Sequence, residues 1–122
     1  MTKEQVIQLT AFIERFEKEK PLFSLYKEIT MAPYRYGKAI SDFQDVWIRN
    51  GFMEINYESI RKPFSENYKQ EEWYTHLSEQ ETMQSIQFII RNDRFVDGFI
   101  ATMIEEKVLP RLLEQLKNIH NL

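Results

Sequence analysis

The amino-acid sequence predicts an all-α protein, a single compact domain of residues 1–122 with five or six helices and a short extended strap near residues 52–57. Three observations support this prediction. Apolar residues recur at three- and four-residue spacing in several stretches, which is the period of an amphipathic helix. Two of these stretches follow a pattern typical of helix starts. The length of 122 residues suits one domain with a substantial core.

The first helix is expected from about Lys3 to Lys18. Thr2 fits the position that caps the helix, and Gln5 follows three residues later, as in a capping box. Pro21 is expected to stop the helix. Its core face is formed by residues at helical spacing, namely Val6, Leu9, Phe12, Ile13 and Phe16.

The next segment contains a short apolar stretch and a connector. The stretch reads as a short helix that includes Leu22, Phe23, Leu25, Tyr26 and Ile29. Residues 32–37 are expected to form the connector, because Pro33 disfavours helix at Ala32. A second clear helix then carries Ile40, Phe43, Val46 and Trp47 on one face. Asn50 and Gly51 are expected to end this helix, since glycine adopts left-handed geometry cheaply.

The middle of the chain gives the weakest signals. Residues 52–57 alternate apolar and polar side chains, and no partner strand is predicted, so we expect an extended strap. Residues 58–77 contain Pro63 and clustered charge, and one or two short helices are expected there.

The last third predicts helices again. Ser78 and Glu81 form a second capping box, and Asn92-Asp93 is expected to bend the helix that follows. Apolar residues continue the helical period on both sides of this bend: Met83, Ile86, Ile89 and Ile90 before it, and Phe95, Val96, Phe99, Ile100, Met103 and Ile104 after it. A final helix starts near Val108, with Pro110 tolerated in its first turn.

Composition and charge exclude several classes of function. Residues 1–61 carry nine basic and nine acidic side chains, and residues 62–122 carry seven and ten, for a net charge of −3. Neither half is basic, so nucleic-acid binding is disfavoured. The absence of cysteine excludes disulfides and thiolate metal sites. No apolar segment has the length of a membrane span and no signal sequence is recognised, so a cytoplasmic location is expected.

Sequence motifs of common enzymes are absent. There is no glycine-rich phosphate loop, no HExxH and no GxSxG. His76 and His120 stand without a neighbouring base or nucleophile, and His120 is expected to be solvated. We therefore expect no cofactor and no bound metal, and the question of enzymatic activity stays open. The rings Tyr34, Tyr36, Trp47, Trp73 and Tyr74 belong either to the core or to a pocket lining.

The most informative stretch is Arg91-Asn92-Asp93-Arg94-Phe95-Val96-Asp97-Gly98, called the 91–98 motif below. If it is helical, Asp93 and Asp97 share a face, and Arg94 is close enough to pair with Asp97. Phe95 would then point with Phe99 toward the apolar side. Gly98 costs roughly 1 kcal/mol inside a helix relative to alanine, so a helix junction or a close backbone approach is expected there.

Three interpretations of this motif remain open. In the first interpretation, an intrachain ion-pair network fixes the angle between two helices, and its members are Arg91, Asp93, Arg94 and Asp97. Alternatively, Arg91 and Arg94 bind a phosphate or carboxylate ligand, with Asp93, Asp97 and Tyr36 as further candidates for the binding site. In the third interpretation, Asp93 and Asp97 are oxygen ligands of a divalent cation, although two arginines oppose this.

The chain also resembles a known family. Residues 81–83, 89–99 and 109–116 are similar to small bacterial proteins of unknown function that share an Arg-x-acidic-Arg-Phe-x-acidic-Gly motif followed by a Leu-rich final helix. Residues 43–57 are similar as well, although Ile55-Asn56-Tyr57 replaces the Trp and Asp of many members. The resemblance covers about two thirds of the chain, leaves out the first helix, and implies no activity.

These observations lead to two hypotheses about function. The first is a non-enzymatic cytosolic interaction or structural protein. The surplus of aromatic residues favours a homodimer, in which the partner is a second copy of the chain. The second is a protein that binds, or is an enzyme acting on, a small anionic metabolite through Arg91 and Arg94.

Overall fold

A computed structural model describes residues 1–25 and 34–122 of the chain. Within these residues there are seven α-helices: α1 (Lys3–Thr10), α2 (Phe12–Lys18), α3 (Lys38–Arg49), α4 (Glu58–Asn67), α5 (Glu79–Asn92), α6 (Phe99–Glu105) and α7 (Val108–Ile119). Two short 3₁₀ helices, η1 (Phe52–Glu54) and η2 (Glu71–His76), and two short strands, β1 (Phe23–Leu25) and β2 (Tyr34–Tyr36), complete the list. The predicted all-α class is confirmed. The helices outnumber the predicted five or six partly because the first one is divided at Ala11.

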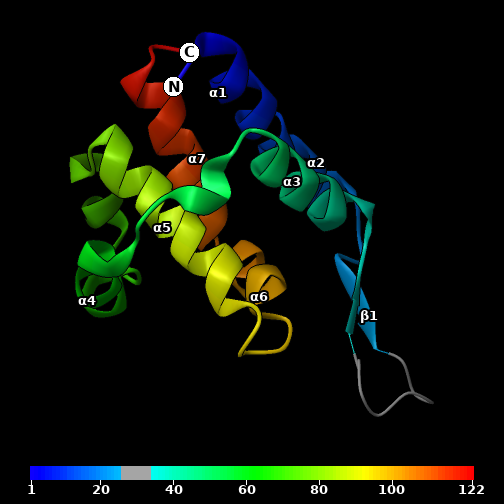
Figure 1. Cartoon of the computed structure of the whole chain (residues 1–122). Coiled ribbons are helices and arrows are strands. Elements are labelled where there is room, and N and C mark those ends of the chain that lie inside the picture. Colours follow the sequence, from blue (N-terminus) through cyan, green and yellow to red (C-terminus); the bar gives the residue numbers. More distant parts are fainter. Residues whose placement is uncertain (26–33) are drawn as a thin grey trace.

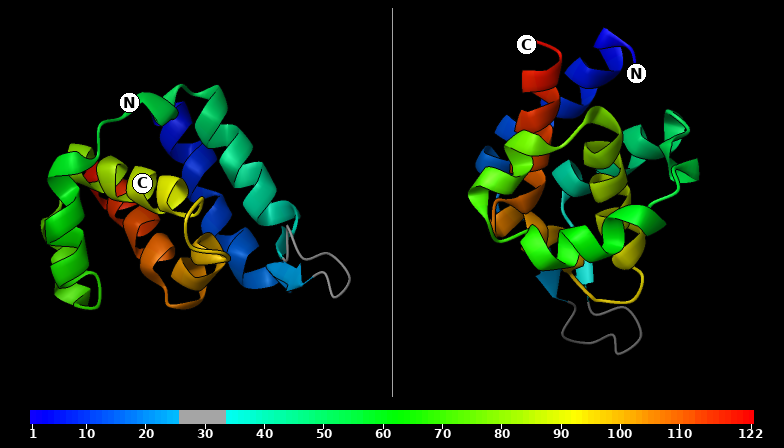
Figure 2. Two further views of the ribbon diagram at one scale, coloured as in Figure 1. Left: turned by 60° about the horizontal axis from the view of Figure 1, so that its bottom comes forward. Right: turned by 90° about the vertical axis from the view of Figure 1, so that its left-hand side faces the viewer.

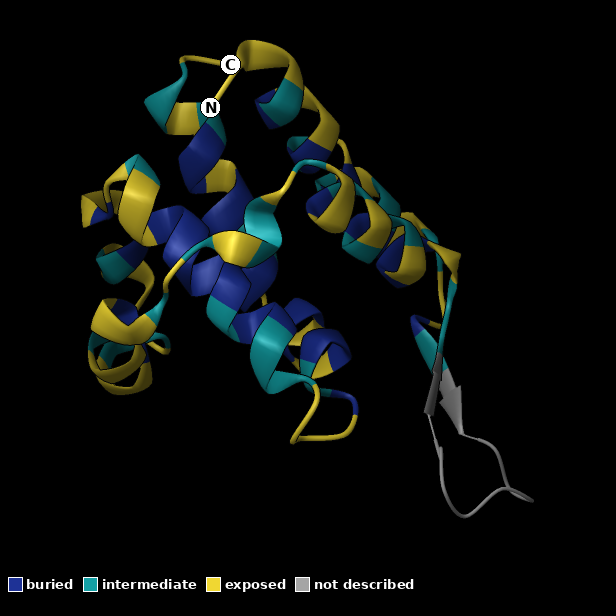
Figure 3. Ribbon diagram, viewed as in Figure 1, coloured by how far each residue is buried: buried dark blue, intermediate teal, exposed yellow. Residues whose placement is uncertain are grey.

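Helix α5 lies at the centre of the molecule and packs against α4, α6 and α7 (Figures 1 and 2). Residues 82–87 of α5 are all buried, so every side of the helix is covered over this stretch (Figure 3). Helix α1 packs against α7 and α3, and the two termini of the chain lie close together at the end of the molecule opposite α6. No helix among the described residues has both the length and the apolar character that a membrane span needs.

The predicted helix ends are largely confirmed. Thr2 and Gln5 form the first capping box, and Ser78 and Glu81 form the second, with both reciprocal hydrogen bonds present in each. Gly51 has φ of +77° where the chain leaves α3. The same left-handed geometry recurs at the start of α6. These are local signals, and local interactions suffice to place them.

The prediction for residues 21–36 is wrong where the structure describes them. Instead of a helix, β1 pairs antiparallel with β2, and Phe23 lies opposite Tyr36. The predicted connector therefore contributes a strand at residues 34–36. Tyr26, Ile29, Ala32 and Pro33, the other residues of that prediction, lie outside the described residues. Two strands of three residues carry too short an alternation to be recognised in the sequence.

The strap near residues 52–57 is confirmed only in part. Its first half is the 3₁₀ helix η1, and only residues 55–57 lack regular structure. Among the rings assigned either to core or to a pocket, Trp47 and Tyr74 are buried in the core, whereas Tyr36 and Trp73 are half-buried against it. Burial raises the pKa of Tyr74 to about 12. The side chain of Tyr34 lies outside the description.

Candidate functional site at the turn between α5 and α6

The 91–98 motif forms the junction between two helices. Helix α5 ends at Asn92, a series of turns follows, and α6 begins at Phe99. Gly98 has φ of +73° at the N-cap of α6, which confirms the expected junction and explains the glycine. Asp93 and Asp97 therefore do not share a helical face, so that prediction is wrong.

Phe95 and Val96 are also placed differently from the prediction. Phe95 was expected on the apolar side, but 83% of its surface is exposed, and Val96 is 47% exposed. The helical period before and after these residues suggested a continuous core face. The turn interrupts the period and directs both side chains to solvent.

Asp93 has a structural role that the sequence did not indicate. One carboxylate oxygen of Asp93 accepts a hydrogen bond from the backbone N–H of Ile100, at 3.1 Å. Ile100 lies in the first turn of α6, and the N-cap residue Gly98 has no side chain that could accept from that turn. Asp93 thus acts as the cap of α6 from five residues upstream of Gly98, and its negative charge suits a helix N-terminus.

Tyr36 is joined to the same carboxylate. Its hydroxyl donates a hydrogen bond to Asp93, which ties β2 to the end of α5 across 57 residues of sequence. Burial raises the pKa of Tyr36, and the hydrogen bond to Asp93 and the charge of that carboxylate raise it further. The hydroxyl consequently stays protonated and remains a donor. The structure therefore brings together two of the predicted site residues, Tyr36 and Asp93.

The predicted ion-pair network is absent from the described part of the chain. No ion pair there includes Arg91, Arg94 or Asp97, and Asp93 accepts from a hydroxyl and an amide instead of a guanidinium. Arg91 is half-buried, whereas Arg94 and Asp97 are exposed. Residues 1–25 and 34–122 also contain no group of three potential metal ligands, so nothing in this region favours the interpretation of a divalent cation site.

A pocket lined with aromatic rings lies beside this turn. It has a volume of about 220 Å³ and is called the ring pocket below. Its lining residues come from α4, its C-terminal cap and helices α5 and α6, and they are Phe64, Ser65, Tyr68, Phe88, Asn92, Phe99 and Met103. The phenyl rings of Phe64 and Phe88 meet edge to face with centroids 5.0 Å apart. Sequence reasoning missed the pocket, because Phe99 and Met103 were assigned only to the apolar period of a helix.

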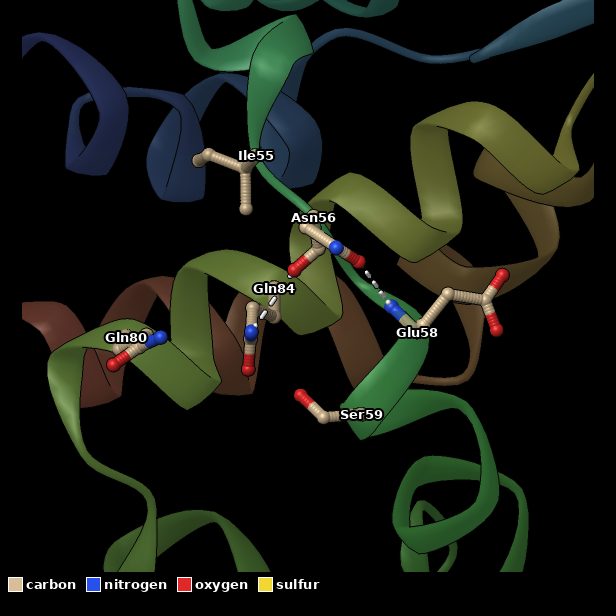
Figure 4. A pocket seen from close by; sticks show the side chains of 6 residues that line it. All are labelled: Ile55, Asn56, Glu58, Ser59, Gln80 and Gln84. Carbon is tan, nitrogen blue, oxygen red and sulfur yellow. Dashed lines mark hydrogen bonds between the residues drawn. The ribbon is translucent and has the colours of Figure 1, made fainter.

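A larger, open groove lies at the opposite end of α5. It has a volume of about 540 Å³ between the start of α5 and the first turn of α4 (Figure 4). Ile55 and five polar residues line it, and none of them is basic; the polar residues are Asn56, Glu58, Ser59, Gln80 and Gln84. Gln84 donates to the backbone carbonyl of Asn56 at 2.9 Å, and Asn56 accepts from the backbone of Glu58. Several of its polar groups thus serve to hold the chain between η1 and α4.

The two histidines lie apart from the turn. His76 is exposed at the end of η2. His120 is half-buried and its Nε2 contacts the carboxylate of Glu79, so the prediction that His120 is solvated is wrong. This contact joins the end of α7 to the start of α5.

The fold and the turn define a small all-α protein with a capped helix junction. Its sequence matches the model of a family of unknown function (DUF6508) over residues 1–121, and the chain belongs to this family. The match includes α1, which the resemblance noted from the sequence left out. No curated protein and no solved structure matches the chain significantly.

Proposed function

We propose that this chain is a non-enzymatic interaction protein, and that the 91–98 motif is its contact surface. The observation that carries the proposal is the exposure of Phe95, the most exposed of the large apolar side chains in the described part of the chain. Phenylalanine and arginine are both enriched in protein interfaces relative to the rest of the protein surface.

The turn that presents Phe95 is anchored on both sides. Asp93 before it is held by Tyr36 and Ile100, and Gly98 after it is buried at the start of α6. A fixed backbone reduces the conformational entropy that a contact residue loses on binding. Arg94 and Asp97 flank the ring and are exposed, so each is available to a partner.

Photo-crosslinking tests this proposal in cells. A benzoylphenylalanine residue replaces Phe95, and a matched control carries it at Ile48, an exposed apolar position on α3. We expect a crosslinked product of discrete mass from position 95 that position 48 does not give. The absence of any product from position 95, or the same product from both positions, would contradict the proposal.

A second candidate function is the binding of a small anion by Arg91 and Arg94. The observation that favours it is that neither guanidinium pairs with a carboxylate among the described residues. Inorganic phosphate and citrate would then raise the melting temperature of the wild-type chain, but not that of Arg91→Ala. Asp93 and Tyr36 would hold the turn in place behind this site, because their polar atoms bind each other.

The proposal further places the chain in the cytoplasm of a bacterium. The resemblance to bacterial proteins and the absence of cysteine support this. It also takes the Arg-x-acidic-Arg-Phe-x-acidic-Gly pattern as a feature that relatives share. Cell fractionation and an alignment of family members would test these two points.

A further inference from the structure

We propose that the partner of the 91–98 motif is a second copy of this chain, and that Phe95 of each copy inserts into the ring pocket of the other. This inference rests on the proposed function, because it takes the turn as a contact surface. It adds the identity of the partner and the residues that receive Phe95.

The exposed ring and the pocket are neighbours on one end of the molecule. Asn92 and Phe99, which flank the turn in sequence, both line the pocket. Phe95 is three residues from Asn92, so their Cα atoms are at most roughly 11 Å apart. Figures 1 and 2 show α4, the start of α6 and the turn at the end of the molecule opposite the termini.

This adjacency matches the geometry of a two-fold dimer. In such a dimer, if one residue of the first copy contacts another residue of the second copy, the same pair of residues also meets with the two copies exchanged. A protruding ring beside a receiving pocket therefore completes two contacts at once. The Phe95 ring does not fill the pocket of its own chain, since 83% of its surface is exposed.

The size and chemistry of the pocket fit a phenyl ring. Its volume is about 220 Å³, and an apolar cavity of roughly 150 Å³ is enough to hold benzene. Phe64, Phe88 and Phe99 offer ring faces and edges, which favour tilted contacts with another ring. Ser65 is exposed beside the pocket and marks its open side.

The charged residues on either side of Phe95 have opposite signs, so two copies of this surface can complement each other. Arg94 and Asp97 are both exposed, and neither forms an ion pair in the described part of the chain. A two-fold axis through the turn brings Arg94 of one copy toward Asp97 of the other. An exclusively basic or acidic surface would instead repel its own copy.

Analytical ultracentrifugation of the full chain tests this arrangement. We expect the wild type to dimerise reversibly, and Phe95→Ala to raise the dissociation constant at least about 100-fold. Ser65→Trp, which places a bulky ring over the pocket, should weaken self-association as well. Ile48→Ala serves as the control and should leave it unchanged, and circular dichroism verifies the fold of each variant.

Mixing the two weakened variants gives the sharper result. Phe95→Ala retains the pocket and Ser65→Trp retains the inserting ring, so together they keep one of the two insertions. We expect a heterodimer that is stronger than either homodimer. A monomeric wild type at high concentration, or unchanged dimerisation by Phe95→Ala, would overturn this inference.

The two proposals fail in distinguishable ways. A crosslinked product at position 95 with twice the 14.8 kDa mass of the chain supports both. A product with another protein, together with a monomeric wild type, overturns the dimer and leaves the contact surface in place. No product at position 95, together with dimerisation that Phe95→Ala does not change, overturns both.

Discussion

Helix α5 and the turn that follows it use their polar side chains in opposite ways. Within α5 (Glu79–Asn92), Gln87 is buried, its Oε1 accepts from Trp47 at 2.8 Å, and its Nε2 donates to the carbonyl of Met53 at 2.7 Å. In the turn after α5, Arg94 and Asp97 reach solvent with no ion pair among the described residues. Buried polar groups must find partners inside the protein, whereas exposed ones are free to bind other molecules.

This difference distinguishes polar side chains that hold the fold together from polar side chains that can contact another molecule. Gln84 and Gln87 donate to backbone carbonyls of η1 and of the irregular segment that follows it, at residues 53, 55 and 56. No buried side-chain nitrogen or oxygen among the described residues is left without a partner. The 91–98 motif contains both kinds of residue: Asp93 binds Tyr36 and Ile100 within the chain, whereas Arg94 and Asp97 face solvent.

The largest effect is expected for Gln87→Ala. It leaves the indole N–H of Trp47 and the carbonyl of Met53 unpaired in the core, and it opens a cavity. We expect the free energy of unfolding to fall by roughly 3 kcal/mol in urea titrations. Gln80→Ala, on the exposed side of the same helix, is the control and should change it by less than about 0.5 kcal/mol. Equal effects of the two variants would show that the buried hydrogen bonds of Gln87 contribute no more to stability than an exposed side chain does.

Asp93→Ala is expected to have the next largest effect. It removes the acceptor of the Ile100 N–H and of the Tyr36 hydroxyl, so α6 loses its cap. A loss of roughly 2 kcal/mol of stability is expected. The matched control is Asp97→Ala, which lies in the same motif but is exposed, and which should cost less than about 0.5 kcal/mol. A larger loss of stability in Asp97→Ala than in Asp93→Ala would show that Asp97, and not Asp93, stabilises the turn.

Tyr36→Phe isolates one of these two hydrogen bonds. Only the hydroxyl is removed, and Asp93 keeps its bond to Ile100. We expect a decrease of about 1 kcal/mol in the free energy of unfolding at neutral pH. In combination with Asp93→Ala, the two changes should be less than additive, because the partner of the hydroxyl is already gone. Full additivity in a double-mutant cycle would argue against this contact.

Alkaline pH is expected to weaken the same contact. The pKa of Tyr36 is raised in the folded state, so the folded form keeps its proton where the unfolded form releases it. The stability from this group is fully present below pH about 10, the value for an unperturbed tyrosine, and is lost as pH rises above it. Tyr36→Phe should make the decline shallower. Some decline in stability at alkaline pH should remain in this variant, because the pKa of Tyr74 is also raised, to about 12.

The smallest effects are expected at the exposed residues of the motif. Arg94→Ala and Phe95→Ala remove side chains without a buried partner among the described residues, so the stability of the monomer should change by less than about 0.5 kcal/mol. Unfolding is measured at a concentration too low for self-association, because dimer formation would itself add stability. Any loss of crosslinking or self-association in these variants then reports on binding. A large destabilisation of the monomer by Phe95→Ala would show that the ring packs within its own chain.

The sequence predicted the signals that act over a few residues. The capping boxes at Thr2 and Ser78 and the glycine at the junction of α6 are local, since each requires only a hydrogen bond or a φ angle within one turn. All candidate site residues except Tyr36 were chosen from one stretch of sequence. Their roles were assigned on the assumption that this stretch is helical, and the turn at residues 93–98 changes that geometry.

The sequence by itself thus determined the helical class, most helix ends and the glycine junction at the start of α6. Only the tertiary structure decided that Tyr36 meets Asp93 and that Phe95 faces solvent. It also decided that rings from α4, α5 and α6 enclose a pocket. The physical reason is range: caps and periodicity act within a few residues, whereas these contacts join segments that only the packing around α5 brings together.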